Sequence, residues 1–325
     1  MPWFGRASRH PWVVLLLCVS CFSLPPAITE SPQDLLNAGR VDQIILVLDE
    51  QIRTSASPEA YNFLCRAYFE LGAWDAGIPD CERAVALAPD NALFHLWLGR
   101  IYGEKADHAG FLSAAGLARK VRTEFERAVE LAPNNWEART DLAEFYLEAP
   151  GIVGGGKDKA RAQADLIAPL NPAMAHWVKA RIAEKNKETG IAEQEYRAAI
   201  EASHGGARAC LNFAGFYRHR DRFDEMEYEL RSMESSPVDF PAALVDAAGM
   251  LLRTGRDSPM AIRLLRRYLA SVTVEEAPAF KAHEMLGQLL EKQGDRENAA
   301  RQYREALALA HTFRPAQEGL KRVTR

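Results

Sequence analysis

The segment from Gly151 to Lys157 has the spacing of a phosphate-binding loop, G-x-x-x-x-G-K. Such a loop cradles phosphates with its backbone N–H groups, and it needs a following Ser or Thr whose hydroxyl binds magnesium. Asp158 stands at that place and adds negative charge where a phosphate would lie. The loop should also follow a strand, whereas the segment ending near Glu148 has a helical pattern. We therefore interpret the segment as a glycine-rich link between two helices, with Asp158 capping the second, and predict no nucleotide binding.

Side chains that commonly bind metals or attack substrates are scattered through this chain. No two histidines share a helix at positions i and i+4, the arrangement of a helical zinc site. No serine has the nucleophile-elbow spacing, and no cysteine has a histidine and an acid arranged near it. His95 and His283 stand where an internal repeat otherwise carries a large aromatic residue, so we expect them to pack. We predict no catalytic residue, no metal and no cofactor.

The composition is that of an ordinary folded protein. Of its 325 residues, 48% are hydrophobic and 26% are charged, and the formal net charge is −4. Proteins that bind nucleic acids carry a marked excess of basic residues. We therefore predict no nucleic-acid partner.

The first 27 residues have the character of a leader. A basic start with Arg6 and Arg9 precedes the apolar run Trp12–Leu24, and Ala27 follows two prolines. A basic start, a short apolar run and a small residue describe a secretory signal peptide. The run is well short of the roughly 20 residues that a membrane-spanning helix needs. We predict that residues 1–27 are a signal peptide cleaved near Ala27, which makes the protein periplasmic or secreted.

A lipid anchor is the alternative for this leader. Cys21 follows Val19 and Ser20 as a lipidated cysteine would, although Cys18 takes the place where leucine normally stands. The exported protein would then meet the membrane through Cys21 alone.

Three further cysteines follow in the chain, Cys65, Cys81 and Cys210. An odd number leaves at least one free thiol or an intermolecular partner.

One pattern recurs along most of the chain. It reads EFERAVELAPNN at Glu124–Asn135, DCERAVALAPDN at Asp80–Asn91 and QYREALALAHTF at Gln302–Phe313. Each copy has the pattern of a helix with small and aromatic residues on one face. A recurring unit of this kind indicates stacked repeats, each of which buries its apolar face on its neighbours.

Each repeat is expected to contain two helices. In the unit that begins at Pro58, the apolar residues at i, i+3, i+4 and i+7 are Tyr61, Leu64, Cys65 and Tyr68. Gly72 ends this helix, and the inner face of a second helix carries Gly77, Cys81, Ala84 and Val85. Small residues at such a crossing allow two antiparallel helices to approach closely.

These units resemble the tetratricopeptide repeat, which carries W-x2-L-G-x2-Y on its first helix, then A-x3-F and a closing proline. The small position of the second helix recurs at Ala84, Ala128, Ile167, Ala199, Met233, Tyr268 and Ala306. These spacings scatter around the 34 residues of the family. The resemblance covers about residues 31–325, with a degenerate capping hairpin at 31–57, about seven repeats at 58–313 and a capping helix at 314–325. It implies an all-α fold, a right-handed superhelical solenoid of antiparallel helix pairs, in a bacterial exported protein.

Two insertions lengthen the early repeats, at Gly103–Gly116 and at Ala149–Lys157. The first carries Phe111 and Leu112 near its middle. This insertion either covers the groove of the solenoid or extends the second helix of its repeat, and the sequence leaves both possibilities open.

The resemblance also implies where a partner would bind, because first helices line the concave side of such a solenoid. The exposed positions between the packing residues are Phe63, Arg66, Phe69, Trp97, Arg100, Arg181 and Arg218. Aromatic residues beside arginines are typical of interaction hot spots. Arg66 and Arg100 hold equivalent places in adjacent repeats, so they could grip a carboxylate or an extended peptide. Alternatively, Phe63 and Trp97 pack between repeats, and the arginines form local ion pairs.

Within a hairpin of this family, Cys65 and Cys81 hold places that face each other. In an oxidising compartment they could form a disulfide, whereas otherwise both act as small buried apolar residues.

We therefore expect a non-catalytic scaffold or adaptor that binds a protein or peptide in its concave groove in the cell envelope. One alternative is an envelope assembly factor anchored by a lipid on Cys21. A second is an enzyme whose site lies in the insertions.

Overall fold

We describe the protein from a computed structural model, in which residues 30–235 and 238–325 are described. The signal-peptide and lipid-anchor predictions, with Cys21, lie outside these residues. Within them every regular element is helical, and no β-strand occurs. This confirms the predicted all-α fold class. None of the helices in these two ranges combines the length and the apolar character needed to cross a membrane.

The residues from Ser31 to Arg325 form one compact unit built from successive helix pairs. The pairs are α1 (Pro32–Asn37) with α2 (Val41–Thr54), α3 (Pro58–Glu70) with α4 (Trp74–Leu87), α5 (Ala92–Asp107) with α6 (Phe111–Leu131), α7 (Trp136–Glu148) with α8 (Lys157–Ile167), α9 (Pro172–Lys185) with α10 (Thr189–Ala202), α11 (Ala207–Arg218) with α12 (Phe223–Ser235), α13 (Ala242–Thr254) with α14 (Ser258–Leu269), and α15 (Ala279–Lys292) with α16 (Arg296–Leu309). A short 3-10 helix, η1 (Gly151–Val153), lies between α7 and α8, and α17 (Arg314–Thr324) follows the last pair.

The asparagines after the second helices start the next pairs. The Asn91 side chain accepts a hydrogen bond from the backbone N–H of Leu93 at 3.0 Å, and Asn135 accepts one from Glu137 at 3.0 Å. A side-chain oxygen at this place satisfies an N–H group that the first turn of a helix leaves free. The repeated proline and asparagine motif therefore fixes where one pair ends and the next begins.

Small residues set the distance between the two helices of a pair. A Cβ atom on Gly77 of α4 would lie 2.8 Å from Tyr68 Cβ of α3, and one on Gly287 of α15 would lie 2.7 Å from Tyr303 Cε1 of α16. Both distances are too short for carbon atoms, so only glycine fits at these crossings.

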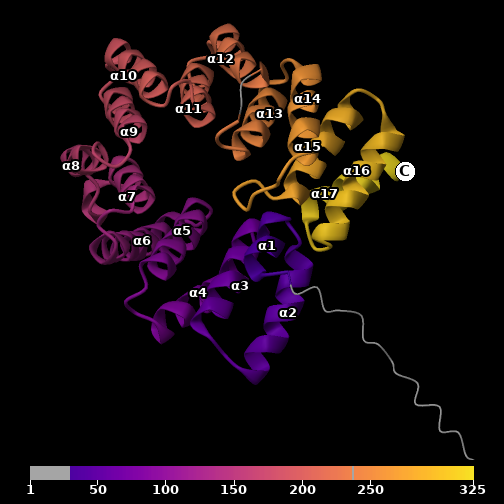
Figure 1. Cartoon of the computed structure of the whole chain (residues 1–325), viewed down its shortest axis with the longest axis horizontal. Helices are drawn as coiled ribbons and strands as arrows, with labels where there is room; N and C mark the ends of the chain where they lie inside the picture. The colour runs from indigo at the N-terminus through magenta and orange to yellow at the C-terminus, as the bar shows by residue number, and fades with distance from the viewer. Residues whose placement is uncertain (1–29, 236–237) are drawn as a thin grey trace, which may run out of the picture. The chain divides into compact units, whose positions relative to one another are not determined.

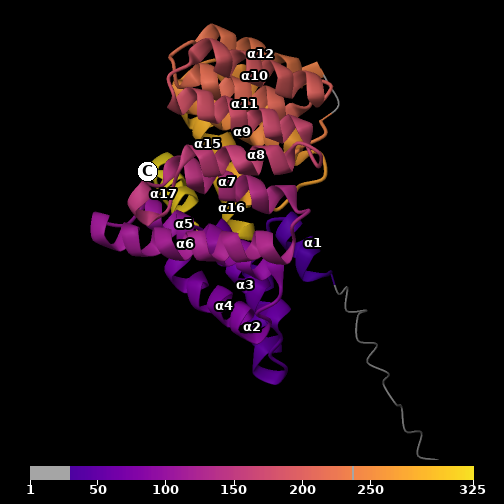
Figure 2. The same ribbon diagram turned by 90° about the vertical axis from the view of Figure 1, so that its left-hand side faces the viewer.

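The pairs follow one another along a curve with the odd-numbered helices on its inner side (Figure 1). Viewed from the side, the outer helices α6, α8, α10 and α12 stack one above another (Figure 2). Inner helices of adjacent pairs generally contact each other, as α3 does with α5 and α7 with α9. The described residues thus form the helical solenoid that the repeats predicted.

The inner helices α5 and α7 are an exception. Their backbones approach each other less than those of the other neighbouring inner helices, whereas α6 packs on α7. The Arg100 Nε donates to Asp141 Oδ2 at 2.7 Å and bridges the two helices. A cavity lies at this point of the inner surface.

Candidate functional site

Five of the predicted groove residues form one cluster on the inner helices α3 and α5. The Cζ atom of Arg66 lies 4.9 Å from the ring centroid of Phe63 and 5.2 Å from that of Trp97. The Cζ atom of Arg100 lies 4.9 Å from the Trp97 ring, and the Phe69 and Trp97 rings meet edge to face at 5.4 Å. Guanidinium groups over aromatic faces are attracted by the ring quadrupole.

The donors of this cluster are used within the molecule. Arg66 is only 7% exposed, and its Nε donates to Glu275 Oε1 at 2.7 Å while Nη2 donates to Gln33 Oε1 at 2.7 Å. Trp97 is 8% exposed. A partner would have to displace Glu275 to reach the Arg66 guanidinium.

Arg181 and Arg218 lie apart from this cluster, on α9 and α11. Arg181 Nη2 donates to Glu148 Oε1 at 2.8 Å, and Arg218 Nη2 donates to the His219 ring at 2.7 Å. Burial and the nearby charge of Arg218 lower the pKa of His219. The Nε atoms of both arginines are buried and have no hydrogen-bond partner among the described residues.

Cys65 of α3 and Cys81 of α4 are joined by a disulfide, with their Cα atoms 5.1 Å apart. Both are fully buried. Cys210 is a buried free thiol, and burial raises its pKa. The disulfide therefore links the two helices of one pair at their crossing.

The histidines singled out in the sequence have structural partners. His95 Nδ1 lies 2.6 Å from Glu124 Oε2, and its Nε2 lies 2.8 Å from the Pro89 carbonyl oxygen. His283 Nδ1 lies 2.8 Å from Gln302 Oε1. No group of three or more potential metal ligands occurs in the described part of the chain.

The glycine-rich loop packs tightly between α7 and α8. Gly154 has a positive φ of 104°, and a Cβ atom on Gly155 would overlap the Ala149 carbonyl. Lys157 Nζ donates to Asn186 Oδ1 at 2.7 Å. The glycines are thus explained by close backbone approach, and Lys157 ties α8 to the end of α9.

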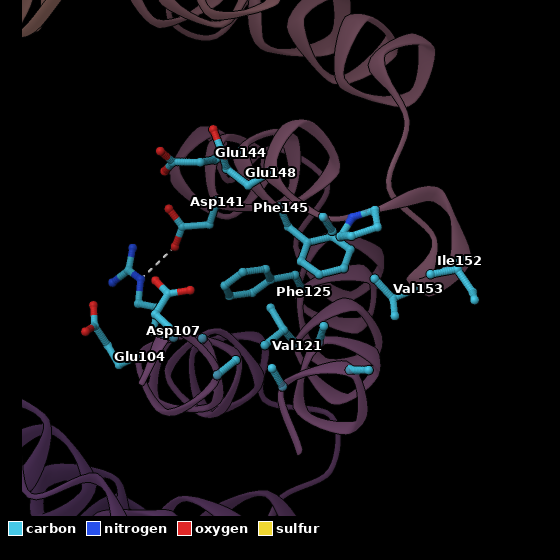
Figure 3. Close-up of a pocket in the computed structure, with 18 of the residues that line it drawn as sticks. Glu104, Asp107, Val121, Phe125, Asp141, Glu144, Phe145, Glu148, Ile152 and Val153 are labelled. Carbon is cyan, nitrogen blue, oxygen red and sulfur yellow. Dashed lines mark hydrogen bonds and ion pairs between the residues drawn. The ribbon is translucent and has the colours of Figure 1, made fainter. Parts of the chain in front are cut away.

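A cavity of about 960 Å³ lies between α5, α6, α7 and η1. Figure 3 shows acidic side chains along one side of it and apolar side chains along the other. The acidic residues are Glu104, Asp107, Asp141, Glu144 and Glu148, and Arg100 is the one basic residue that the described part of the chain contributes to the lining. The apolar residues include Phe69, Val121, Phe125, Phe145, Ile152 and Val153. The cavity therefore has an apolar wall and an excess of negative charge.

The two insertions create this cavity. The first lengthens both helices of its pair, giving α5 16 residues and α6 21, whereas α7 has 13 and α8 has 11. Of the two possibilities left open by the sequence, the structure shows the longer second helix. The extension of α6 carries alanines at 114, 115 and 118, whose small side chains leave space in front of η1.

The surroundings of Glu144 in the cavity favour its protonated form. The Glu144 side chain is exposed at the surface of the cavity, but the neighbouring protein removes part of its hydration. This desolvation raises the pKa of Glu144 above its ordinary value, Arg181 opposes the rise, and Asp141 and Glu148 add to it. A cation brought into the cavity would relieve this repulsion.

The sequence prediction assigned no site to Asp141 and Glu144, which lie on α7. It also identified both insertions without recognising that they face one another. Asp107 and Glu104 belong to the extended part of α5, which the repeat pattern does not describe. One signal in the sequence could have indicated the cavity wall: Ala114, Ala118, Val121 and Phe125 are spaced to lie on one face of a long helix.

A family model of the tetratricopeptide repeat matches residues 64–122 and 247–312. No curated protein sequence matches this chain.

Among solved structures, yeast Tom70 is similar with 16% identity and a TM-score of 0.54. The similarity covers 91% of this chain and 64% of the Tom70 chain, slightly under two thirds of that structure's length. A thermophilic tetratricopeptide repeat protein of Thermus thermophilus is 17% identical with a TM-score of 0.46, over 61% of this chain and 100% of that chain. Because the sequence identity to Tom70 is 16%, this similarity indicates a shared fold and nothing more.

Proposed function

The chain is a tetratricopeptide repeat protein, and we propose that it is a non-catalytic scaffold or adaptor that holds a protein or peptide segment on its concave side in the cell envelope. Tetratricopeptide repeats support a role in protein interaction in general. The concave binding mode and the envelope location are our proposals.

The observation that carries the proposal is the charged strip along the inner helices. Glu144 on α7, Arg181 on α9, Arg218 on α11 and Asp246 on α13 lie between buried packing residues. Surrounding protein raises the pKa of Asp246 despite the nearby charges of Arg253 and Arg208. Charges in partly desolvated surroundings interact more strongly with a ligand than fully hydrated charges do.

Two features support export to the envelope. The leader of residues 1–27 has the pattern of a signal peptide. The Cys65–Cys81 disulfide would persist in an oxidising compartment. If the protein is instead a lipid-anchored assembly factor, the mass of its mature N-terminus will correspond to a lipidated Cys21.

Site-specific photo-crosslinking tests the concave binding mode. Benzoylphenylalanine is placed at Asp246 on the inner surface or at Tyr228, which is 73% exposed on the outer helix α12. We expect a polypeptide to be crosslinked in cells from Asp246 and not from Tyr228. Equal crosslinking from both positions, or from Tyr228 alone, would contradict concave binding.

A charge reversal tests the same surface by another route. Burial and, to a smaller extent, the nearby charge of Arg218 lower the pKa of Arg253. Because Arg218→Glu removes this like charge, the fold should tolerate the substitution. We expect about a tenfold loss of the crosslinked adduct, because an enclosed charge contact contributes more than an exposed one. Arg304→Glu on the outer helix α16 is the matched control and should leave the adduct unchanged.

A further inference from the structure

We propose that the cavity between α5, α6, α7 and η1 binds a polypeptide segment in which a bulky apolar side chain stands beside Lys or Arg residues. This inference rests on the proposed function, because it assigns a chemistry to one part of the concave side. The repeat pattern does not point to this cavity.

The apolar wall lacks a cover within the described part of the chain. Ile152 of η1 is 86% exposed at its edge. Phe125 and Val121 are buried in the core of their pair, at 6% and 4% exposure, and form a fixed floor of the cavity. At about 960 Å³, the cavity lies at the upper end of the range in which protein pockets enclose ligands. An apolar side chain of a partner would remove the exposed Ile152 and the half-buried Phe145 from water.

The acidic wall selects the charge of the occupant. Asp141 is paired with Arg100, and Glu148 is paired with Arg181 and Lys185. For Glu104, Asp107 and Glu144, by contrast, no cation lies within 4 Å among the described residues. Three carboxylates without an ion-pair partner within 4 Å around one cavity attract cations and repel anions, although Arg181 offsets part of the charge of Glu144.

The arrangement of the two walls favours a peptide. Figure 3 shows Glu104, Asp107, Asp141 and Glu144 on the side opposite Ile152 and Val153, with Phe125 and Phe145 between them. A bound segment can therefore place its apolar residue over the two phenyl rings and its basic residues against the carboxylates. The cavity also opens along the inner helices α5 and α7, which provide a surface for the rest of the segment.

Selection from a phage-displayed library of random dodecapeptides tests this chemistry without an assumed partner. The purified protein is the bait. We expect enrichment of peptides that combine an aromatic or large aliphatic residue with at least two Lys or Arg residues. Enrichment of acidic peptides, or no enrichment over an uncoated surface, would overturn the proposal.

Two variants locate the binding of the selected peptides. The triple variant Glu104→Gln, Asp107→Asn, Glu144→Gln keeps the shapes of the side chains and removes mutual repulsion, so its melting temperature should not fall. We expect its peptide affinity to fall about tenfold, because three screened ion pairs are lost. Ile152→Asn should weaken binding several-fold with no effect on folding, because Ile152 is exposed.

Matched controls distinguish the cavity from general charge effects. Asp165→Asn, Glu201→Gln and Glu305→Gln remove three exposed carboxylates from the outer helices α8, α10 and α16. Val272→Asn changes a side chain that is 80% exposed in another loop. Both controls should bind the peptides like the unchanged protein.

The outcomes separate this inference from the proposed function. If the peptides bind equally to the triple variant but are lost with Arg218→Glu, the concave side is a binding surface and the cavity is not its site. If neither variant weakens binding and no crosslink forms from Asp246, both proposals fail.

Discussion

The carboxyl group of Asp80 on α4 lies where burial and a like charge both oppose ionisation. It is half-buried, and Asp49 of α2 is the nearby acid. Burial, with a smaller contribution from Asp49, raises the pKa of Asp80 to about 6. The ordinary value of 3.8 applies to the unfolded chain. The folded protein therefore binds the Asp80 proton more tightly than the unfolded chain does. Ionisation of Asp80 consequently destabilises the folded state.

Replacing Asp80 by Asn should stabilise the protein in a pH-dependent manner. Below about pH 4 the carboxyl is protonated in both states, so the variant has no advantage. The advantage grows as pH rises to about 6 and is constant above, at about 1 kcal/mol once solvent screening is allowed for. Chemical denaturation at pH 4 and pH 8 measures it. Asp75→Asn, on an exposed acid of the same helix, is the control, and a gain at pH 4 equal to that at pH 8 would contradict the assignment.

The position of a single residue could be predicted from the sequence where its contacts are made within its own repeat or the next one. The spacing of Phe63, Arg66, Trp97 and Arg100 on consecutive first helices predicted inner-surface positions, and the structure brings these residues into contact. The Glu275 partner of Arg66 was not predictable, because it is 209 residues away in the sequence. No local pattern specifies a contact that depends on the accumulated curvature of many repeats.

The pair α3–α4 is the element in which a covalent bond adds to helix packing. Its disulfide joins residues separated by 16 positions, and closing a loop of this size restricts the unfolded chain. We expect the Cys65→Ala, Cys81→Ala double variant to lose about 3 kcal/mol of unfolding free energy.

Thermal unfolding with and without a reductant checks this prediction. Reductant should lower the melting temperature of the unchanged protein and leave that of the double variant unaffected. Cys210→Ala should retain the response to reductant, because Cys210 is a free thiol. A protein whose melting is insensitive to reductant, with both thiols alkylated in the native state, would show that the disulfide is not formed.

At the element scale, helix type followed from periodicity, whereas helix length did not. Apolar spacing in α3 and α4 reports which residues pack and therefore predicts two helices. The additional turns of α5 and α6 extend these helices beyond the length of the neighbouring pair, so the repeat pattern does not describe them. The cavity arises from these additional turns, and for that reason the sequence located the insertions but not the site.

The whole Ser31–Arg325 unit is closed by contacts between its first and last helices. Besides Arg66 and Glu275, Glu70 Oε2 accepts from Lys281 Nζ at 2.8 Å, and Asp42 Oδ2 accepts from the His311 backbone N–H at 2.7 Å. One apolar core extends from α1–α3 into the helices of the C-terminal half. In a simple repeat stack each unit contacts only its neighbours. Here the stability of the first pair also depends on the last pair, and that of the last pair on the first.

The Arg66–Glu275 pair should control this closure. Glu275 is 5% exposed, so Glu275→Ala leaves the Arg66 guanidinium buried without its carboxylate, at an expected loss of about 3 kcal/mol. Because the pair joins the two ends of the unit, small-angle X-ray scattering should also show a larger radius of gyration. The double variant Arg66→Met, Glu275→Leu replaces both charges by apolar groups and should recover most of the stability and the compact dimension. If Glu275→Ala keeps the original radius and melting temperature, the terminal pairs do not depend on this contact, and the remaining contacts between the first and last helices suffice for closure.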